Sequence, residues 1–532
     1  MEDYAVAELM ASADAVAPGL GALVGVLAGM VNGLTGPDAA GMSFDAVERQ
    51  ITVDGRELLR MAAQHVMDGR AAREERLAAV TDAQGVRRTR CEPGHARTMA
   101  SSLGHVRVTR MAYRAPGTAA LHPADAVLDL PPRRQSWQVQ RTVAGYVLAG
   151  SYGQARRFLL EATGVKVGKL QIEQIVADAA ADAPGFYDPP GEDRGPDENQ
   201  GGDGDVPPDE EGEGEDLLAG APLVISADGK GVLMRPEARR PVRGKRGQKV
   251  KKLGKRVGLG EKPGTKRMAE TGVVFDAIAP PGPPRTPGQV MTRAAGEPAR
   301  GPKAVNRWYT IDITASRKQT ISALLDEADR RDPGRQRTWI ALVDGDVHQI
   351  SLIGTEAARR QVPVTILIDF IHVLEYLWKA AWCFHPAGDP AAETWVTAQA
   401  LAILHGQPAE VIATVNQLAE AHPPRPRSEH DKNIRAVVSY LTAKAPHLDY
   451  PAALANGWPI ATGVIEGACR HLVADRLGIT GARWSLQGAQ AILWLRAIRA
   501  NGDLDAYWNH HISQEHQRNH ASRYQNAQAL AA

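Results

Sequence analysis

The sequence predicts an α/β protein with an all-helical insertion after the strands of its sheet and a mostly helical N-terminal region before them. Three observations support this fold class. Short apolar runs, several ending in aspartate, follow one another between residues 221 and 370, as expected for buried strands. Residues 373–460 show only helical periodicity. A Gly/Pro-rich acidic stretch, 185–217, separates the sheet from the N-terminal region.

Length and composition indicate the number of domains and the general class of protein. A chain of 532 residues predicts about three or four domains. Hydrophobic content of 43% and charged content of 23% are typical of a globular protein. The three cysteines, Cys91, Cys383 and Cys469, are too few for a disulfide framework. We therefore expect a reducing bacterial cytoplasm.

The first segment of interest is Ala15–Gly36, which is uncharged and about long enough to span a bilayer. It is rich in Gly and Ala, contains Pro18 and follows an acidic start, whereas a signal peptide needs a basic one. We expect a packed or poorly ordered segment and no membrane partner.

A helical and a β region follow. Residues 43–77 predict one or two helices, and His105–Arg114 alternates like a strand with a partner around Arg97–Ser101. Cys91 and His95 are the zinc-ligand candidates nearby, and two ligands do not make a structural zinc site. We assign none.

Residues 136–182 predict three helices, of which the second ends at Gly164. The short turn before the third helix fits a helix-turn-helix. Four basic side chains would then lie near a phosphate backbone: Arg156, Arg157, Lys166 and Lys169. The alternative is a plain helical hairpin with solvated charges.

Charge is strongly segregated along the chain. The stretch Asp188–Asp216 holds 13 acidic residues and one arginine, whereas Arg235–Met268 holds 14 basic residues and two glutamates, so a net charge of +1 hides −12 and +12. The acidic stretch 185–217 has almost no large apolar residues, which predicts a disordered linker. The basic stretch indicates a polyanionic partner.

The sheet elements come next, in a regular order. Strands are expected at 221–234, 271–278 and 307–314, then a helix at 316–331, a strand at 338–350, another helix, and a strand at 362–370. This order matches the RNase H-like fold. Asp228, Asp344 and Asp369 end the first, fourth and fifth strands, a usual place for chemistry in α/β sheets. Taken singly, Asp228–Gly229 and Asp344–Gly345 are ordinary turn signals.

After the sheet, 373–460 is the helical insertion, in which Trp378, Trp382 and Trp395 are interpreted as core residues. A further helix then carries Glu466 at the edge of its apolar stripe, with Arg470 one turn on. Glu466 is interpreted either as an intrahelical partner of Arg470 or as a third metal carboxylate.

Several phrases together resemble the DDE transposases of bacterial insertion sequences, in particular the ISKra-type family related to Mutator-like elements. They are ADGKGVLMRPEARR, ALVDGDVHQI, LIDFIHVLEYLWKAAWCFHP, GWPIATGVIEGACRHLVADR and ITGARWSLQGAQAILWLRAIRANGD. The resemblance covers roughly residues 85–525. It implies that Asp228, Asp344 and Glu466 are the catalytic, metal-binding acids, and that Asp369 and His372 form an auxiliary D/C-x-x-H signature. Locally, Asp369 is also suited to cap a helix that starts at His372.

The implied chemistry uses two divalent ions about 3.5–4 Å apart, which activate water and stabilise the leaving oxygen. Mg²⁺ suits a few carboxylates, with Mn²⁺ as a substitute and Asp228 as the expected bridging ligand. The freed 3′-OH would then attack target DNA. We assign no Ser or Tyr nucleophile.

Double-stranded DNA, at element ends and target, is the expected partner, bound by a homodimer or higher oligomer in association with the nucleoid. Seven basic residues of 235–268 suit phosphate neutralisation, the alternative being a solvated loop: Lys245, Arg246, Lys249, Lys251, Lys252, Lys255 and Arg256. Arg470, His471 and Arg483 are candidates for DNA contact near Glu466, although His471 alone is equally suited to a core position.

The expected domains are a helical region (1–84), a small β region with a helix-turn-helix-like part (85–184), the acidic linker (185–217), the first part of the core (218–372), the insertion (373–460) and the last part of the core (461–532). Two other functions compete with transposition: a domesticated DNA-binding protein that no longer cuts, and an RNase H-like nuclease or resolvase. A glycosidase with paired carboxylates would leave the basic stretch unexplained.

Overall fold

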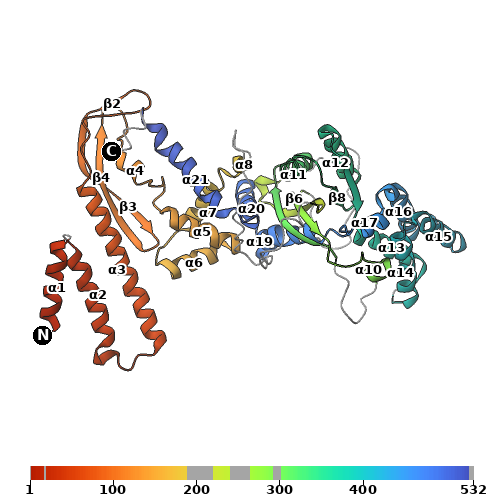
Figure 1. The fold of residues 1–532 in the computed structure, drawn as a ribbon, viewed down its shortest axis with the longest axis horizontal. Coiled ribbons are helices and arrows are strands. Elements are labelled where there is room, and N and C mark those ends of the chain that lie inside the picture. Colours follow the sequence, from red (N-terminus) through yellow and green to blue (C-terminus); the bar gives the residue numbers. More distant parts are fainter. Residues whose placement is uncertain are drawn as a thin grey trace. The chain divides into compact units, whose positions relative to one another are not determined.

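The computed structural model describes residues 2–16, 19–187, 220–239, 264–291, 301–386 and 388–525 (Figure 1). The chain divides into two compact units. Unit 1 comprises residues 1–193 together with 505–532, and unit 2 comprises residues 194–504.

Unit 2 is built on one mixed sheet of five strands, in the spatial order β7-β6-β5-β8-β9. The strands are β5 (Leu223–Leu233), β6 (Lys266–Ile278), β7 (Lys303–Asp312), β8 (Trp339–Val343) and β9 (Val364–Ile368). Strand β6 is antiparallel to both β5 and β7, whereas β5, β8 and β9 run parallel. The expected α/β class and all five expected strands are confirmed.

One strand differs from its prediction. Asp228 does not end β5 but lies within it, opposite Thr271 of β6. Strand β5 pairs with β8 only from Leu223 to Ile225, and beyond that point it continues with β6 alone. Asp228–Gly229 is therefore not a turn. Gly345, by contrast, has a φ of +96°, so Asp344–Gly345 does form one.

Helices cover both faces of the sheet. On one face, α11 (Arg317–Arg331) lies so close to β6 that a Cβ on Gly272 would meet Leu324 Cδ2 at 2.8 Å. Thr271 precedes Gly272 and therefore points to the opposite face. There it lies against Cys469, at the start of a π-helical turn, η5 (Cys469–Ala474), that continues α18 (Gly463–Ala468).

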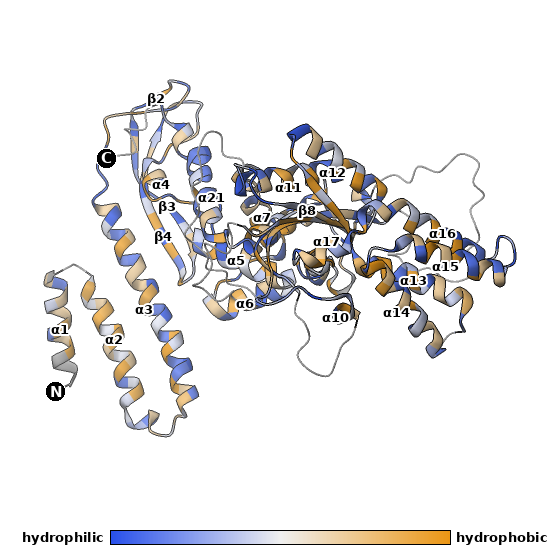
Figure 2. Cartoon of the chain, turned by 45° about the vertical axis from the view of Figure 1, so that its right-hand side comes forward, coloured by the Kyte–Doolittle hydropathy of each residue, from blue (hydrophilic) through white to orange (hydrophobic). Residues whose placement is uncertain are grey.

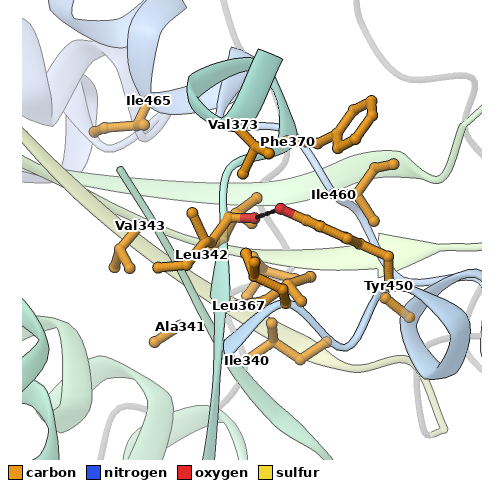
Figure 3. Close-up of a cluster of buried hydrophobic side chains, with 14 of the residues drawn as sticks. Ile340, Ala341, Leu342, Val343, Leu367, Phe370, Val373, Tyr450, Ile460 and Ile465 are labelled. Carbon is orange, nitrogen blue, oxygen red and sulfur yellow. Dashed lines mark hydrogen bonds between the residues drawn. The ribbon is translucent and has the colours of Figure 1, made fainter. Parts of the chain in front are cut away.

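The core lies under the carboxyl ends of the parallel strands. All five residues of β8 are buried, and the strand is hydrophobic along its length (Figure 2). Tyr450 packs among Leu367, Phe370 and Ile460, and its hydroxyl donates to the Ile368 carbonyl at 2.9 Å (Figure 3). A buried hydroxyl with an acceptor stabilises the end of β9 in one position.

The helical insertion is confirmed as helical and shares this core. Its helices are α13 (Phe370–Phe384), α14 (Pro390–Leu404), α15 (Pro408–Ala421), α16 (Glu429–Lys444), the 3₁₀ turn η4 (Ala445–His447) and α17 (Tyr450–Ala455). Val396, Val411 and Val437 belong to the same cluster as β8. Trp378 and Trp395 pack against that cluster, as predicted. The core interpretation of Trp382 is wrong, since this side chain is 43% exposed and stacks on Trp378 at 5.1 Å.

The rest of unit 2 joins and closes these parts. Its remaining elements are η2 (Pro236–Ala238), α10 (Pro287–Met291), α12 (Val347–Arg360) between β8 and β9, α19 (Asp475–Leu477), η6 (Ile479–Gly481) and α20 (Leu486–Ala500). Gln490 of α20 accepts from the Ile313 amide at 2.8 Å, which fixes this helix beside the end of β7.

Unit 1 begins with helices and a β-hairpin. It contains α1 (Glu2–Val16), α2 (Leu20–Thr35), η1 (Pro37–Ala39), α3 (Phe44–Ala72), the short strands β1 (Val80–Thr81) and β2 (Arg87–Arg88), the hairpin β3 (Arg90–Ser101) and β4 (Gly104–Arg114), and α4 (Pro123–Val127). Most of the segment suspected at Ala15–Gly36 is α2. In the part of the chain that the structure describes, no helix is both long and apolar enough to cross a membrane.

The three helices expected at 136–182 are also confirmed: α5 (Trp137–Ala149), α6 (Tyr152–Thr163) and α7 (Lys169–Ala179). Ser151 and Gln154 cap the start of α6 reciprocally, and Gly164, with a φ of +71°, ends it. Buried Leu159 and Ile172 pack α6 and α7 into one helical body.

The last helix belongs to unit 1. We expected 461–532 to close the sheet domain, but α21 (Leu504–Asn519) and η7 (Ala521–Arg523) fall in unit 1. The Tyr507 hydroxyl donates to the Ala179 carbonyl at 2.5 Å, and His511 Nδ1 lies 2.7 Å from Asp182 Oδ2. Buried polar contacts of this kind hold the helix in place.

The start of the expected linker is also folded. Residues 185–187 were predicted to be disordered, yet Phe186, in α8 (Ala183–Phe186), is buried and its ring lies 5.2 Å from that of Tyr507. One aromatic side chain has enough apolar area to order this turn. The rest of the linker, 188–217, lies outside the described residues.

Candidate active site

The parallel strands bring three aspartates to one level of the sheet. Val343 pairs with Ile368, and Asp344 and Asp369 are the next residues on each strand. Ile225 pairs with Ala341, and Asp228 and Asp344 each follow three positions later. In this order of strands, Asp344 lies between Asp228 and Asp369. The usual spacing of about 4.8 Å holds for β8 and β9, which are paired up to Val343 and Ile368, whereas β5 is no longer paired with β8 at Asp228.

Side chains join β5 to β8 where the backbone pairing stops. The Ser226 hydroxyl donates to the Leu342 carbonyl at 2.7 Å, and the Gln349 side-chain amide donates to the Ala227 carbonyl at 2.8 Å. The strand that carries Asp228 is thus fastened to β8 and α12 directly before the aspartate. This fastening limits how far Asp228 can move from Asp344.

Asp344 lies in a tight turn that begins α12. Its Oδ1 accepts from the Asp346 amide at 2.9 Å, and Asp346 in turn caps the helix by accepting from the Gln349 amide at 3.0 Å. That amide, more than any other group, lowers the pKa of Asp346, and Arg317 adds to the effect at 3.1 Å. Asp346 is therefore committed to structure, whereas Asp344 keeps Oδ2 available.

Asp369 is completely buried and has two roles. Its Oδ1 caps α13 by accepting from the Ile371 amide at 3.0 Å, so the capping interpretation is confirmed, although the helix starts before His372. Its Oδ2 accepts from the Thr462 hydroxyl at 2.6 Å and lies 3.4 Å from His372 Nδ1. The hydrogen bond to this carboxylate raises the pKa of His372 above its usual value.

Glu466 joins Asp369 and His372 through Thr462. Its Oε1 lies 3.1 Å from the Thr462 hydroxyl, which has a single proton and also contacts Asp369. One potential ligand atom from each of Asp369, His372 and Glu466 lies within 4.8 Å of the other two. Among the described residues, this is the one group of three that could hold a metal ion in this way. Asp228 and Asp344 do not belong to it.

Asp228 meets the segment that carries Glu466 through Cys469. The thiol is buried against Asp228 and Thr271, and its burial, together with the charge of Asp228, raises its pKa to about 12. It therefore stays protonated, a neutral neighbour of the carboxylate. The sequence had indicated Cys469 only as part of an apolar stripe, and its position three residues after Glu466 was the available signal.

The candidate acids lack the cationic partners that other acids have. Among the described residues, no Arg or Lys forms an ion pair with Asp228, Asp344, Asp369 or Glu466. The Glu466–Arg470 pair, the alternative interpretation of Glu466, is therefore not formed. By contrast, Asp276 pairs with Arg337 at 2.5 Å, and Glu356 pairs with Arg360 at 2.7 Å. Uncompensated carboxylates at one sheet edge fit divalent cations, which such a cluster binds readily.

The helical insertion supplies one wall of the site. The Tyr440 hydroxyl lies 3.3 Å from the Asp344 carbonyl, and its ring stacks on Tyr376 with centroids 3.7 Å apart and planes 6° apart. The Lys379 ammonium lies 4.2 Å from the centre of the Tyr376 ring. Sequence reasoning missed these residues because Tyr440 is far from Asp344 along the chain.

The expected DNA-contacting residues are spread over both units. Arg156, Arg157, Lys166 and Lys169 are exposed on unit 1, and Arg470 and Arg483 are exposed on unit 2. His471 is 69% exposed and lies 3.0 Å from Asp475, so its interpretation as a core residue is wrong. The seven residues from Lys245 to Arg256 lie outside the described part of the chain.

Comparisons with known proteins add no assignment. No protein-family model and no curated protein matches this chain. The resemblance to insertion-sequence transposases therefore stays a prediction that rests on the sequence phrases.

Proposed function

We propose that this protein is a DNA transposase of the DDE type. It would cleave DNA at the ends of a mobile element and transfer the freed 3′-OH to target DNA with the help of two Mg²⁺ ions. The observation that carries the proposal is the group of carboxylates at the ends of β5, β8 and β9, joined by Glu466, which have no Arg or Lys partner among the described residues. Such a group near phosphates is of no use to a protein that only binds DNA.

The fold supports the same proposal. A five-stranded sheet with three antiparallel strands followed by two parallel ones, in the order β7-β6-β5-β8-β9, is what we interpret as an RNase H-like core. We interpret α5, α6 and α7 as a helix-turn-helix-like DNA-binding part, because their exposed face carries Arg156, Arg157 and Lys169.

The described residues suggest how ions would be shared. Asp228 and Asp344 lie on neighbouring strands and would hold one ion, while Asp369, His372 and Glu466 would hold another. Bound ions would supply Lewis-acid stabilisation of the attacked phosphate. An imidazole among the ligands favours Mn²⁺ over Mg²⁺ at the second position, because softer divalent ions accept nitrogen ligands more readily.

The test uses labelled duplex DNA that carries the terminal inverted repeats flanking the gene. Wild-type protein with Mg²⁺ should give nicked and then joined products, and Asp228→Asn, Asp344→Asn and Glu466→Gln should each give none above background. Asp475→Asn is the matched control, because this exposed acid pairs with His471 and is not one of the candidate metal ligands.

Each competing function has its own outcome. Specific binding without cleavage by the wild type would favour a domesticated DNA-binding protein. Cleavage without strand transfer would favour a nuclease or resolvase. Equal products from wild type and Asp228→Asn would contradict the proposal altogether.

A further inference from the structure

Lys444 lies at the end of α16 and reaches the turn that holds Asp344. The side chain is buried, with 5% of its area exposed. Its Cε would lie 3.5 Å from a Cβ placed on Gly345. One helical turn earlier, Tyr440 contacts the Asp344 carbonyl at 3.3 Å, which fixes the end of α16 against this turn.

In the described part of the chain, the Lys444 ammonium forms no ion pair and no hydrogen bond with another side chain. Burial lowers its pKa, and the charges of Asp346 and Asp344 act in the opposite direction. Asp346 is already held by Arg317 and by the Gln349 amide, so it is not a free counter-ion.

The stem of Lys444 is buried, whereas its Nζ keeps contact with solvent, so the ammonium stays accessible to an anion. Elsewhere in unit 2, buried Glu327 and Arg331 satisfy each other at 2.6 Å, as do Glu356 and Arg360 at 2.7 Å. Lys444 is held next to a carboxylate of the candidate site without being paired to it. This arrangement leaves its donors free for an anion that arrives from outside the chain.

We propose that Lys444 binds a non-bridging oxygen of a DNA phosphate at the carboxylate site, so that the helical insertion contributes a substrate-contacting residue. This inference rests on the proposed function. The carboxylates repel a phosphodiester, and bound divalent ions offset that repulsion only on their own side. The Lys444 ammonium, close to Gly345, would add a positive charge beside that phosphate. Its stabilisation grows as negative charge develops on the oxygens during transfer.

The neighbouring residues suit this role. Tyr376 and Tyr440 stack in parallel, and Lys379 lies against Tyr376, so a second cation stands on the same helical wall. The stack packs α13 against α16, the helix that carries Lys444. A side chain that is already held in place loses less entropy when it contacts a ligand.

The test compares Lys444→Gln and Lys444→Arg with Lys432→Gln, a control on the same helix whose lysine is exposed and pairs with Glu429 at 3.6 Å. Single-turnover cleavage of end-containing duplex is measured across a Mg²⁺ titration. Lys444→Gln should slow cleavage about 100-fold. Lys444→Arg should recover part of that loss, and Lys432→Gln should match wild type. The Mg²⁺ midpoint should not move, because Lys444 is not a metal ligand.

A second measurement does not depend on cleavage. The salt dependence of duplex binding is measured with Ca²⁺ in place of Mg²⁺, and the slope for Lys444→Gln should fall by about 1. An unchanged slope, or cleavage by Lys444→Gln at the wild-type rate, would overturn the assignment of Lys444. Absence of cleavage by the wild type, with a reduced slope for Lys444→Gln, would count against the transposase proposal and keep the phosphate contact.

Discussion

Acidic side chains of unit 2 fall into two groups by their partners. Asp276, Glu327 and Glu356 are buried and paired with arginines. Asp228 and Asp344, at the edge of the sheet, have no such partner among the described residues. Buried carboxylates are stable when paired, so those left unpaired at one place mark where an external cation would add most. Ion pairs alone do not separate structural acids from candidate functional ones, because buried Asp332, without an ion pair among the described residues, accepts from the Gln336 and Arg337 amides and from Trp339.

Gly345 offers a prediction at the residue scale. Its φ of +96° is poorly accessible to other residues, and a Cβ there would lie 3.1 Å from the Tyr440 hydroxyl. Gly345→Ala should therefore cost roughly 1–3 kcal/mol of stability and displace Asp344, with cleavage falling further than stability. Urea denaturation and single-turnover cleavage would measure the two effects.

The control for this substitution is Gly354→Ala. Gly354 is exposed in the middle of α12, and nothing lies within 4 Å of an added Cβ. Gly354→Ala should raise the free energy of unfolding by roughly 0.5–1 kcal/mol, because alanine loses less backbone entropy than glycine when a helix forms. Equal effects of the two substitutions would contradict the role assigned to the turn.

The sequence was sufficient to predict the candidate residues that follow strands, but not the residues that contact them in space. Asp344 and Asp369 could be predicted because each directly follows an apolar run. Tyr440 and Lys444 could not, since they approach the Asp344–Gly345 turn from a helix distant in sequence, whereas the one signal for Cys469 was its position three residues after Glu466. Periodicity shows which face of a helix is apolar, but not which strand that face will meet.

At the scale of elements, local signals were sufficient for most boundaries. The capping residues Ser151 and Ser316 stand directly before α6 and α11, and Gly164 directly follows α6. Two features were not predictable from such signals. The π-helical turn from Cys469 depends on packing against β5 and β6. The docking of α21 depends on Asp182, more than 300 residues away.

The attachment of α21 should depend on pH. Burial raises the pKa of Asp182 and is the largest single effect on it. The hydrogen bonds from Arg518 and His511 and the charges of both groups together outweigh burial, and they hold this pKa well below its usual range. A depressed carboxyl pKa contributes stability that is present above the unfolded pKa, about 3.9, and is lost as pH falls below it. Unfolding of unit 1, followed by circular dichroism, should therefore become easier below about pH 4.

Two variants separate this ion pair from general acid effects. Asp182→Asn should remove about 1–2 kcal/mol at neutral pH, after allowance for solvent screening, and should flatten the acid dependence. Asp505→Asn is the matched control, since Asp505 of α21 pairs with Arg141 of α5 but is largely exposed. Loss of stability in Asp505→Asn equal to that in Asp182→Asn would refute a special role for the buried contact.

At the scale of the molecule, the helical insertion and the sheet form one unit. Their apolar residues make a single cluster, from Val273 in β6 to Val415 in α15. The predicted boundary at residue 373 is therefore a boundary of sequence pattern and not of the core. A pattern of strands followed by helices cannot show whether the two share a core, because both arrangements bury the same residues.

The division into two units predicts how fragments behave. A fragment of residues 218–504 should unfold cooperatively by itself, because its core is complete. A fragment of residues 1–193 should unfold at a lower temperature than the same fragment linked to 505–532, because Tyr507 and His511 complete its packing. Calorimetry of the three fragments would measure this, and equal midpoints with and without 505–532 would be the contrary result.

The return of α21 to unit 1 has a consequence for biosynthesis. Domains generally fold as they leave the ribosome, the N-terminal one first. Here the residues that cover Phe186 and pair with Asp182 are translated only after all of unit 2. Until then, the nascent N-terminal unit exposes the apolar surface that α21 covers in the folded protein, while the ribosome synthesises unit 2. Unit 1 is therefore the first part to be translated and the last part to complete its folding.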